Sequence, residues 1–573
     1  MIRSFLCHRI RNIRELTGRL WDFHVLPGNG TQARDYNGLP VSTDTRKVMT
    51  PCCWQTLPGF ASFRGVGVYS TVFQAGGNLA LECKGISHTA TLFLDGQEIA
   101  RHYNAYTPFR ILIKDLPEGL HTLTIHADNR FSPDSALHIP NDYMSYGGIS
   151  RPVVLEQLSD AYIKSLKITP VYNGSSWQVK ITVTVENITD SSLKADLNLE
   201  IAGAGEGTDE IAHCHLKDCV LPANSIFTHT FEAECPNVRE WSPDSPSLYE
   251  VRTMLSADGT AFDDLIDRFG FRQISVEGKQ LLLNRKPLSI RGFCRHEDHP
   301  QYGQALPKEA MAYDLMLLKD LHANSIRTAH YPNDELFLDL CDEMGFLVWE
   351  ENHARGLSEE DMRNPHFEQQ AEEVIREMIP AHYNHPCIYI WGILNECASD
   401  TPYGYECYRR QLELIRSLDG TRPCSFASCK FKTDISFGLV DVVSYNIYPL
   451  WYHNTPPAEY LEDLYSWVQT ETEGKGKPFL ITEIGAGGLY GYHNPEHSHW
   501  TEEYQARVLK EQVEAVLRHP DCIGLYLWQF ADIRISEEWW ATRPRTMNNK
   551  GIVDEFRRPK QAYEIIKELF GRN

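Results

Sequence analysis

The stretch CIYIWGILNE (387–396) joins an apolar run to a polar pair, Asn395 and Glu396. Seven more short apolar runs lie around it between residues 288 and 532, most of them with polar or aromatic side chains at their carboxyl ends. They are LSIRGFCRHED (288–298), NSIRTAHYP (324–332), FLVWEEN (346–352), CSFAS (424–428), VVSYNIYP (442–449), FLITEIGAG (479–487) and IGLYLWQFAD (523–532). Apolar runs of this length are typical of strands that are buried on both faces of a parallel sheet.

Amphipathic stretches separate most of these runs. KEAMAYDLMLLKDLH (308–322) and DELFLDLCDEM (334–344) place apolar residues at positions i, i+3, i+4 and i+7, which is the pattern of a helix with one buried face. Eight apolar strands that alternate with helices predict a (β/α)8 TIM barrel over residues 274–573.

The first half of the chain has a different pattern. Alternating segments such as TATLFLDG (89–96), which ends in the hairpin signal Asp95-Gly96, predict a jelly-roll β-sandwich over residues 1–158. Further alternating strands, such as WQVKITVTVEN (177–187), predict an immunoglobulin-like β-sandwich over residues 159–273.

Composition and charge argue against several classes of protein. A net charge of −22 argues against a general nucleic-acid binder, and no stretch reaches the roughly 20 apolar residues of a membrane span. The basic start MIRSFLCHRIRNIREL (1–16) lacks a continuous apolar segment, so we expect no secretory signal. The fifteen cysteines, among them Cys387, Cys397 and Cys522 in or beside apolar runs, suggest buried free thiols and a reducing, cytoplasmic setting.

Two glutamates stand at the carboxyl ends of predicted barrel strands, where TIM barrels place their chemistry. Glu396 ends the fourth run and Glu483 lies in the seventh, so the two face each other across the barrel mouth. Hydrolysis of a glycosidic bond needs one carboxylic acid to protonate the leaving oxygen and a second carboxylate as nucleophile or base. In retaining enzymes these groups lie about 5–5.5 Å apart. Asn395 supplies an amide that can bind the sugar 2-hydroxyl.

Several of these motifs resemble those of glycoside hydrolase family 2, and the resemblance covers nearly the whole chain. The motifs are RGFCRHED (291–298), SIRTAHYP (325–332), NHPCIYIWGILNE (384–396) and FLITEIGAG (479–487). The resemblance implies that Glu396 is the acid/base and Glu483 the nucleophile of a retaining glycosidase.

Within the family the chain resembles β-glucuronidases, because Asn548-Asn549-Lys550 matches their Asn-x-Lys motif. The resemblance implies that Asn548 and Lys550 bind the carboxylate of the substrate. An ammonium group with three donors and an amide donor suit that role. Arg543 and Arg545 precede the motif and leave galacturonate or another uronic acid open as the substrate.

The resemblance also implies further substrate-binding side chains. They are Asp142, His296, Tyr448, Tyr452 and Trp528. Asp142 has the alternative of an Asx turn after Pro140, and Trp528 that of barrel packing. The run HEDH (296–299) has the residue types of a metal site, but other ligands to support it cannot be named, so we expect no metal.

The resulting prediction is a retaining exo-β-glucuronidase that needs no cofactor. A β-galacturonidase, a neutral-sugar β-galactosidase or β-mannosidase, a transglycosylase and a non-catalytic carbohydrate-binding protein remain alternatives. HARGLSEEDMRNPHF (353–367) contains no long insertion, which predicts an open barrel mouth that accepts large aglycones. By analogy with relatives we expect a homo-oligomer.

Overall fold

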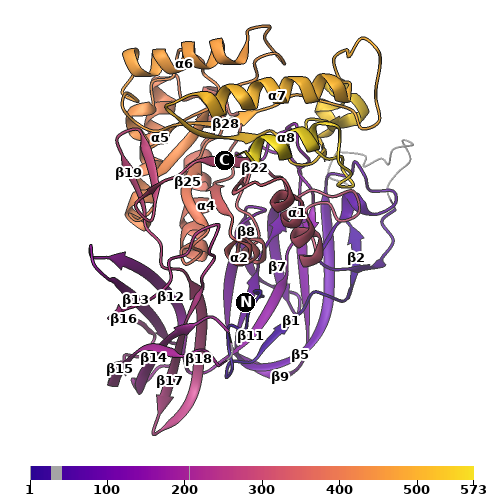
Figure 1. The fold of residues 1–573 in the computed structure, drawn as a ribbon. Coiled ribbons are helices and arrows are strands. Elements are labelled where there is room, and N and C mark those ends of the chain that lie inside the picture. The colour runs from indigo at the N-terminus through magenta and orange to yellow at the C-terminus, as the bar shows by residue number, and fades with distance from the viewer. Residues whose placement is uncertain (1, 27–41, 206, 573) are drawn as a thin grey trace.

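Alternation of buried and exposed side chains builds two β-sandwiches in the first half of the chain. The computed structural model describes residues 2–26, 42–205 and 207–572. In strand β13 (Trp177–Asn187), every second residue is buried, so Val179, Ile181 and Val183 point into the core of the second sandwich. Figure 1 shows both sandwiches below the C-terminal barrel.

The first sandwich contains an eight-stranded sheet and a small three-stranded sheet. Strands β5 (Val66–Cys83) and β9 (Phe109–Asp128) pair along most of their length and form its centre. The remaining strands are β1 (Ile13–Glu15), β2 (Leu20–Val25), β3 (Arg46–Met49), β4 (Cys52–Cys53), β6 (Ile86–Ser87), β7 (Thr89–Leu94), β8 (Gln97–Tyr103), β10 (Gly148–Ile149) and β11 (Val153–Leu158).

The second sandwich packs a three-stranded sheet, in the order β12-β13-β16, against a four-stranded sheet, in the order β15-β14-β17-β18. Seven antiparallel strands in two sheets match the predicted immunoglobulin-like architecture. The other strands are β12 (Ala161–Tyr172), β14 (Leu193–Gly203), β15 (Glu210–Leu221), β16 (Ser225–Cys235), β17 (Tyr249–Ala257) and β18 (Thr260–Phe269), and a small sheet of β19 (Ile274–Glu277), β20 (Gln280–Leu283) and β21 (Lys286–Pro287) follows.

Eight parallel strands close into a barrel, and each lies in one of the eight apolar runs, so the predicted TIM barrel is confirmed. The barrel strands are β22 (Ile290–Cys294), β23 (Ser325–Arg327), β24 (Leu347–Glu351), β25 (Ile388–Ile393), β26 (Cys424–Ser428), β27 (Val443–Asn446), β28 (Phe479–Ile484) and β29 (Cys522–Leu527). The helices are α1 (Lys308–Asp320), α2 (Glu335–Met344), α3 (Glu359–Met362), α4 (Phe367–His382), α5 (Pro402–Leu418), α6 (Pro457–Glu471), α7 (Glu502–Arg518) and α8 (Ala562–Phe570).

Local sequence explains where these elements begin and end. Helix α2 begins at Asp334, whose carboxylate accepts a hydrogen bond from the Leu336 backbone, and ends at Gly345, which has the left-handed conformation that glycine favours. Strand β25 is buried at every position, because it lies between the barrel core and the surrounding helices.

A loop of the first sandwich, residues 129–147, reaches the barrel. The Tyr146 hydroxyl donates a hydrogen bond to Asp298 over 2.7 Å, and the Ser536 backbone donates one to Asn141 over 3.1 Å. These contacts attach the loop to barrel segments on either side of Asp142. The loop therefore holds Asp142, which is buried, at the barrel mouth.

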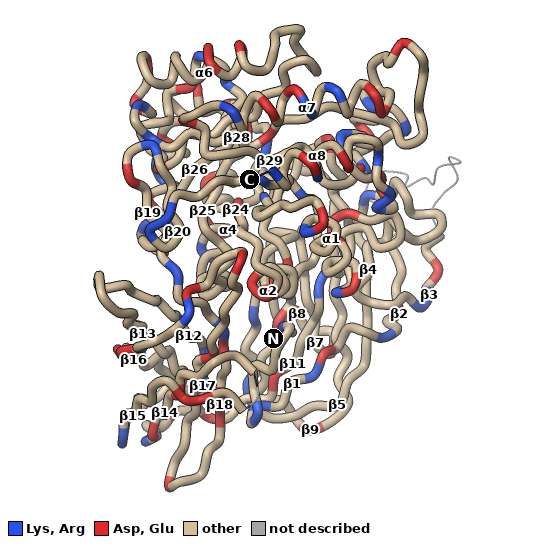
Figure 2. Tube along the Cα trace, in the orientation of Figure 1, with Lys and Arg blue, Asp and Glu red and all other residues tan. Residues whose placement is uncertain are grey.

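Positively and negatively charged side chains are interspersed along the chain in the two sandwiches and in the barrel (Figure 2).

All fifteen cysteines, which the structure describes in full, are free, and Cys429 alone among them is exposed. This agrees with the free thiols predicted from the sequence. Among the described residues, no helix has both the length and the apolar character to cross a membrane.

Arg11 links the two sandwiches. Its buried guanidinium donates to Glu156 on β11 over 2.9 Å and to Asp263 on β18 over 2.9 and 3.0 Å. Removing this cation would leave two buried carboxylates short of a partner, a loss that costs about 3–5 kcal/mol when a buried pair is broken.

We therefore expect Arg11→Met to lower the free energy of unfolding by about 3–5 kcal/mol, which urea denaturation followed by circular dichroism would measure. Arg14→Met is the matched control, because Arg14 is exposed and its guanidinium bonds only to the backbone of Gln74. An equal and small effect of the two substitutions would refute the proposed role of Arg11.

Candidate active site

Glu396 follows β25 in a backbone conformation that is rare for a residue with a side chain. Its φ is 55°, in the left-handed region, and its backbone N–H donates to Ala427 at the end of β26 over 2.9 Å. Such conformations cost about 1–3 kcal/mol and concentrate at functional sites. The carboxylate accepts a hydrogen bond from Asn446 over 2.9 Å and lies 3.5 Å from Arg355.

Glu483 lies in β28 and is fixed through both of its carboxylate oxygens. Arg327 donates to Oε1 over 2.8 Å, and the Tyr448 hydroxyl donates to Oε2 over 2.6 Å. Arg327 also pairs with Glu351 over 3.0 Å, so the guanidinium is itself held in place. The side chain of Glu483 is 4% exposed, whereas that of Glu396 is 18% exposed.

The surroundings of Glu483 change its protonation. Burial raises the pKa of Glu483 to about 7, although Arg327 stabilises its ionised form, and the negative charge of Glu396 adds to the increase. The carboxyl group of Glu483 is therefore partly protonated near neutral pH and becomes ionised as the pH rises.

Asp142, from the loop of the first sandwich, lies among cationic side chains. Its oxygens are 3.3 Å from Arg355 and 3.5 Å from Arg543, and Asn548 donates a hydrogen bond to it over 3.3 Å. Burial by itself would raise the pKa of Asp142, but Arg355, Lys550 and Arg543 lower it to about 2. One ionised carboxylate thus faces three cations.

Lys550 is the cation of this group that makes no ion pair with any described residue. Its ammonium donates to the Tyr452 hydroxyl over 2.9 Å and lies 5.1–5.5 Å from the ring centres of Tyr448, Trp451 and Tyr452. The aromatic rings hold the ammonium without neutralising it. Its charge is therefore available to an anionic ligand.

These side chains line one pocket of about 260 Å³. Among the residues that the sequence singled out, Asp142, Glu396, Tyr448, Tyr452, Glu483, Trp528 and Lys550 line it. The pocket is also lined by Arg355, Cys429, Asn446, Ile447, His453, Tyr460, Trp539 and Arg543. Both glutamates and the cations therefore meet in one place, as expected of a barrel mouth.

Three other predicted residues lie behind the pocket wall. Asn548 contacts Asp142 as described, Asn395 accepts from Arg327 over 2.7 Å, and His296 lies 3.2 Å from the Tyr331 hydroxyl. Nδ2 of Asn395 and Nε2 of His296 are buried and have no hydrogen-bond partner among the described residues. Nδ2 of Asn395 can donate to a hydroxyl group that enters the site, and Nε2 of His296 can donate to one or accept from one.

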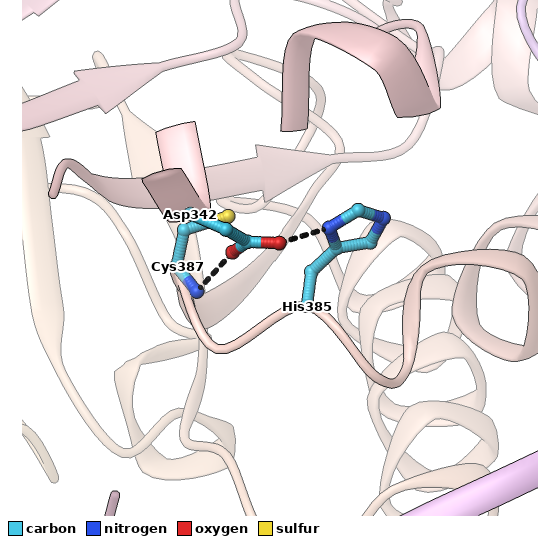
Figure 3. Close-up of side chains that lie close together, drawn as sticks. All are labelled: Asp342, His385 and Cys387. Atoms are coloured by element: carbon cyan, nitrogen blue, oxygen red, sulfur yellow. Dashed lines mark hydrogen bonds and ion pairs between the residues drawn. The ribbon is translucent and has the colours of Figure 1, made fainter. Parts of the chain in front are cut away.

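Asp342, His385 and Cys387 form a cluster with the residue types of a metal site, remote in sequence from HEDH (296–299) (Figure 3). Asp342 accepts from Nδ1 of His385 over 2.6 Å and from the Cys387 backbone over 2.9 Å. Nε2 of His385 lies 3.3 Å from the Arg3 guanidinium, and burial raises the pKa of the Cys387 thiol far above its usual range. The cluster is thus already satisfied internally and adjoins a cation, which disfavours a metal ion.

Sequence reasoning missed some side chains of the pocket. Arg355 lies three residues beyond the third apolar run, and Arg327 lies inside the second, so attention to basic residues near strand ends would have found both. Of the two arginines before the Asn-x-Lys motif, Arg543 reaches the pocket, whereas Arg545 pairs with Glu555.

Comparison with known proteins identifies the family. The profile described as "Glycosyl hydrolases family 2, TIM barrel domain" matches residues 274–572, and "Glycosyl hydrolases family 2" matches residues 161–272. A family 2 β-galacturonidase from Eisenbergiella tayi, solved with galacturonate, is 55% identical with a TM-score of 0.93 and covers 100% of this chain and 99% of its own.

Two β-glucuronidases match less closely in sequence. The protein from Paenibacillus borealis is 26% identical over 98% of this chain and 97% of its own. The structure of the enzyme from Dictyoglomus thermophilum is 25% identical with a TM-score of 0.83, over 99% of this chain and 98% of its own. The chain therefore belongs to glycoside hydrolase family 2, resembles its β-glucuronidases and is a glycosidase.

Proposed function

We propose that the enzyme is a retaining exo-β-uronidase that removes a terminal β-linked galacturonic acid. The observation that carries this proposal is a pocket that combines Glu396 and Glu483 with Lys550, a cation that has no ion-pair partner within the described part of the chain. Identity of 55% over the full length with a β-galacturonidase favours galacturonate. Glucuronate, which differs only in the orientation of the 4-hydroxyl group, is the second candidate, because the β-glucuronidases also match over nearly the whole chain.

Substrate binding starts from the charges of the pocket. The uronate carboxylate docks on Lys550, whose ammonium the aromatic rings leave unneutralised. Asn548 positions Asp142 and the Lys550 backbone. Asp142 and the buried nitrogens of His296 and Asn395 are then in reach of the sugar hydroxyls. These contacts orient the anomeric carbon toward Glu483.

In the first chemical step, an oxygen of Glu483 forms a bond with the anomeric carbon while the glycosidic C–O bond breaks. Arg327 and Tyr448 donate to Glu483 and favour its ionised form. In the reactive state Glu483 is ionised and Glu396 carries a proton, which it gives to the leaving oxygen. The product is a covalent glycosyl-enzyme.

In the second step, water forms a bond with the anomeric carbon, and the ester bond to Glu483 breaks. Glu396, which gave up its proton in the first step, accepts the proton of the water. Two inversions leave the β configuration unchanged.

We expect Glu483→Ala to abolish turnover, and Glu396→Gln to lower kcat roughly 10²–10⁴-fold on substrates with poor leaving groups. Steady-state rates on an alkyl β-galacturonide would measure both effects. Glu459→Ala is the control, because Glu459 is an exposed residue of α6. Turnover by Glu483→Ala at the wild-type rate would exclude Glu483 as the nucleophile.

The pH dependence follows from the protonation of Glu483. Its pKa is raised to about 7, so below that pH the nucleophile is increasingly protonated and kcat/KM for a uronide should fall about tenfold per pH unit. A uronosyl fluoride, whose leaving group needs no proton, should show the same decline toward acidic pH, because Glu483 is the nucleophile for both substrates. Steady-state rates from about pH 4 to about pH 8 would measure this, and a level profile between about pH 4 and about pH 7 would contradict the assignment.

Lys550→Ala tests the substrate. We expect it to lower kcat/KM for p-nitrophenyl β-galacturonide about a hundredfold, roughly 2.7 kcal/mol, and to leave the low rate on the β-galactoside unchanged. The wild-type enzyme should also prefer the galacturonide to the glucuronide. Lys308→Ala, at an exposed residue of α1, is the matched control. Equal losses on the galacturonide and the galactoside would show that Lys550 does not recognise the carboxylate.

A further inference from the structure

The position of Glu396 shows where the leaving group departs. In the proposed mechanism, on which this inference rests, Glu396 protonates the leaving oxygen, so the aglycone must lie on the Glu396 side of the pocket. The Glu396 backbone bonds to Ala427 at the end of β26. The segment that follows β26, residues 429–433, therefore borders the aglycone.

Three aromatic side chains adjoin one another on this side, and we call Phe431, His453 and Tyr460 the plate. The ring centres of Phe431 and Tyr460 are 5.2 Å apart with their planes tilted by 44°, and those of His453 and Tyr460 are 5.7 Å apart and nearly parallel, at 18°. Tyr460 and His453 line the pocket, and Phe431, which is 39% exposed, extends the plate beyond it. Rings arranged in this way offer aromatic faces to a ring-shaped group.

The backbone around the plate is held in place before any ligand binds. The Tyr445 hydroxyl donates to the Phe431 backbone over 2.8 Å, and the Lys432 ammonium lies 5.3 Å from the centre of the Phe431 ring. The Leu450 backbone donates to His453 over 2.6 Å and closes a tight turn. A fixed plate loses little conformational entropy on binding.

Polar groups that are free to bind a ligand surround the plate. The Cys429 thiol, the Tyr460 hydroxyl and the ring nitrogens of His453 make no hydrogen bond to any residue that the structure describes. The Cys429 thiol is a weak hydrogen-bond donor, and the Tyr460 hydroxyl and the ring nitrogens of His453 can donate or accept. An aryl aglycone would need the aromatic faces but not these polar groups.

We propose that Phe431, His453 and Tyr460 form a subsite for a sugar ring, so the preferred substrate is a β-uronosyl saccharide rather than an aryl conjugate. The apolar C–H face of a pyranose packs on the plate. Its hydroxyl groups bond to Tyr460, His453 and Cys429.

Three substrates with the same β-linked uronic acid test this proposal. They are a disaccharide in which it caps a neutral hexose, the p-nitrophenyl glycoside and the glycosyl fluoride. We expect Phe431→Ala to lower kcat/KM for the disaccharide roughly tenfold and to change that for the fluoride less than about twofold. Tyr460→Phe keeps the ring but loses the hydroxyl, so it should slow the disaccharide and spare the p-nitrophenyl glycoside.

Tyr313→Ala is the matched control, because Tyr313 is a half-exposed aromatic residue of α1. The proposal is overturned if Phe431→Ala affects the fluoride as much as the disaccharide, if it leaves the disaccharide unchanged, or if Tyr460→Phe fails to distinguish the disaccharide from the aryl glycoside. Failure of the wild-type enzyme to hydrolyse the fluoride would instead refute the proposed uronidase activity itself.

Discussion

The buried guanidinium of Arg327 is the charge on which the barrel mouth depends. It lies in β23 and pairs with Glu351 from β24 and Glu483 from β28, and it also donates to Asn395. Two carboxylates buried at this depth would repel each other and take up protons without a cation between them. Since Arg327 is completely buried, its own charge is tolerable only because those carboxylates surround it. Glu483, Asn395 and Arg327 therefore form one unit that spans the barrel.

The first sandwich contributes one side chain, that of Asp142, to the pocket at the barrel mouth. Asp142 comes from the first sandwich, yet its closest partners are Arg355, Arg543 and Asn548 of the barrel. Without Asp142, three cations would lie together in a partly desolvated pocket. The packing of the first sandwich on the barrel thus has an electrostatic component at the site.

The sequence predicted those features that follow from periodicity and from strand ends. All eight barrel strands could be located, because an unbroken apolar run such as CIYIWGILNE (387–396) has few alternatives in a protein of this composition. The meeting of Glu396 and Glu483 followed from barrel geometry. Their roles, the boundaries of the three domains and the expected homo-oligomer remain predictions.

Features that depend on loop conformation could not be predicted from the sequence. Phe431 and His453 lie in different loops, and nothing in either segment indicates that Tyr460 brings their rings together. Likewise, Arg543 and Arg545 are separated by one residue, yet one faces Asp142 and the other Glu555. A left-handed residue at Arg545, with φ of 59°, turns the chain between them, and no pattern in the sequence predicts that turn.

The acidic surface and the basic pocket are compatible because electrostatic forces act over short distances in salt solution. At physiological ionic strength the screening length is about 8 Å, so most of the net charge of −22 has little influence inside the pocket. The electrostatic potential inside the pocket is set mainly by the nearby charges of Lys550, Arg355 and Arg543. Asp142 limits it, because its ionised carboxylate offsets part of the positive charge of these three side chains. The charge of the substrate is therefore better inferred from the side chains that line the pocket than from the isoelectric point of the protein.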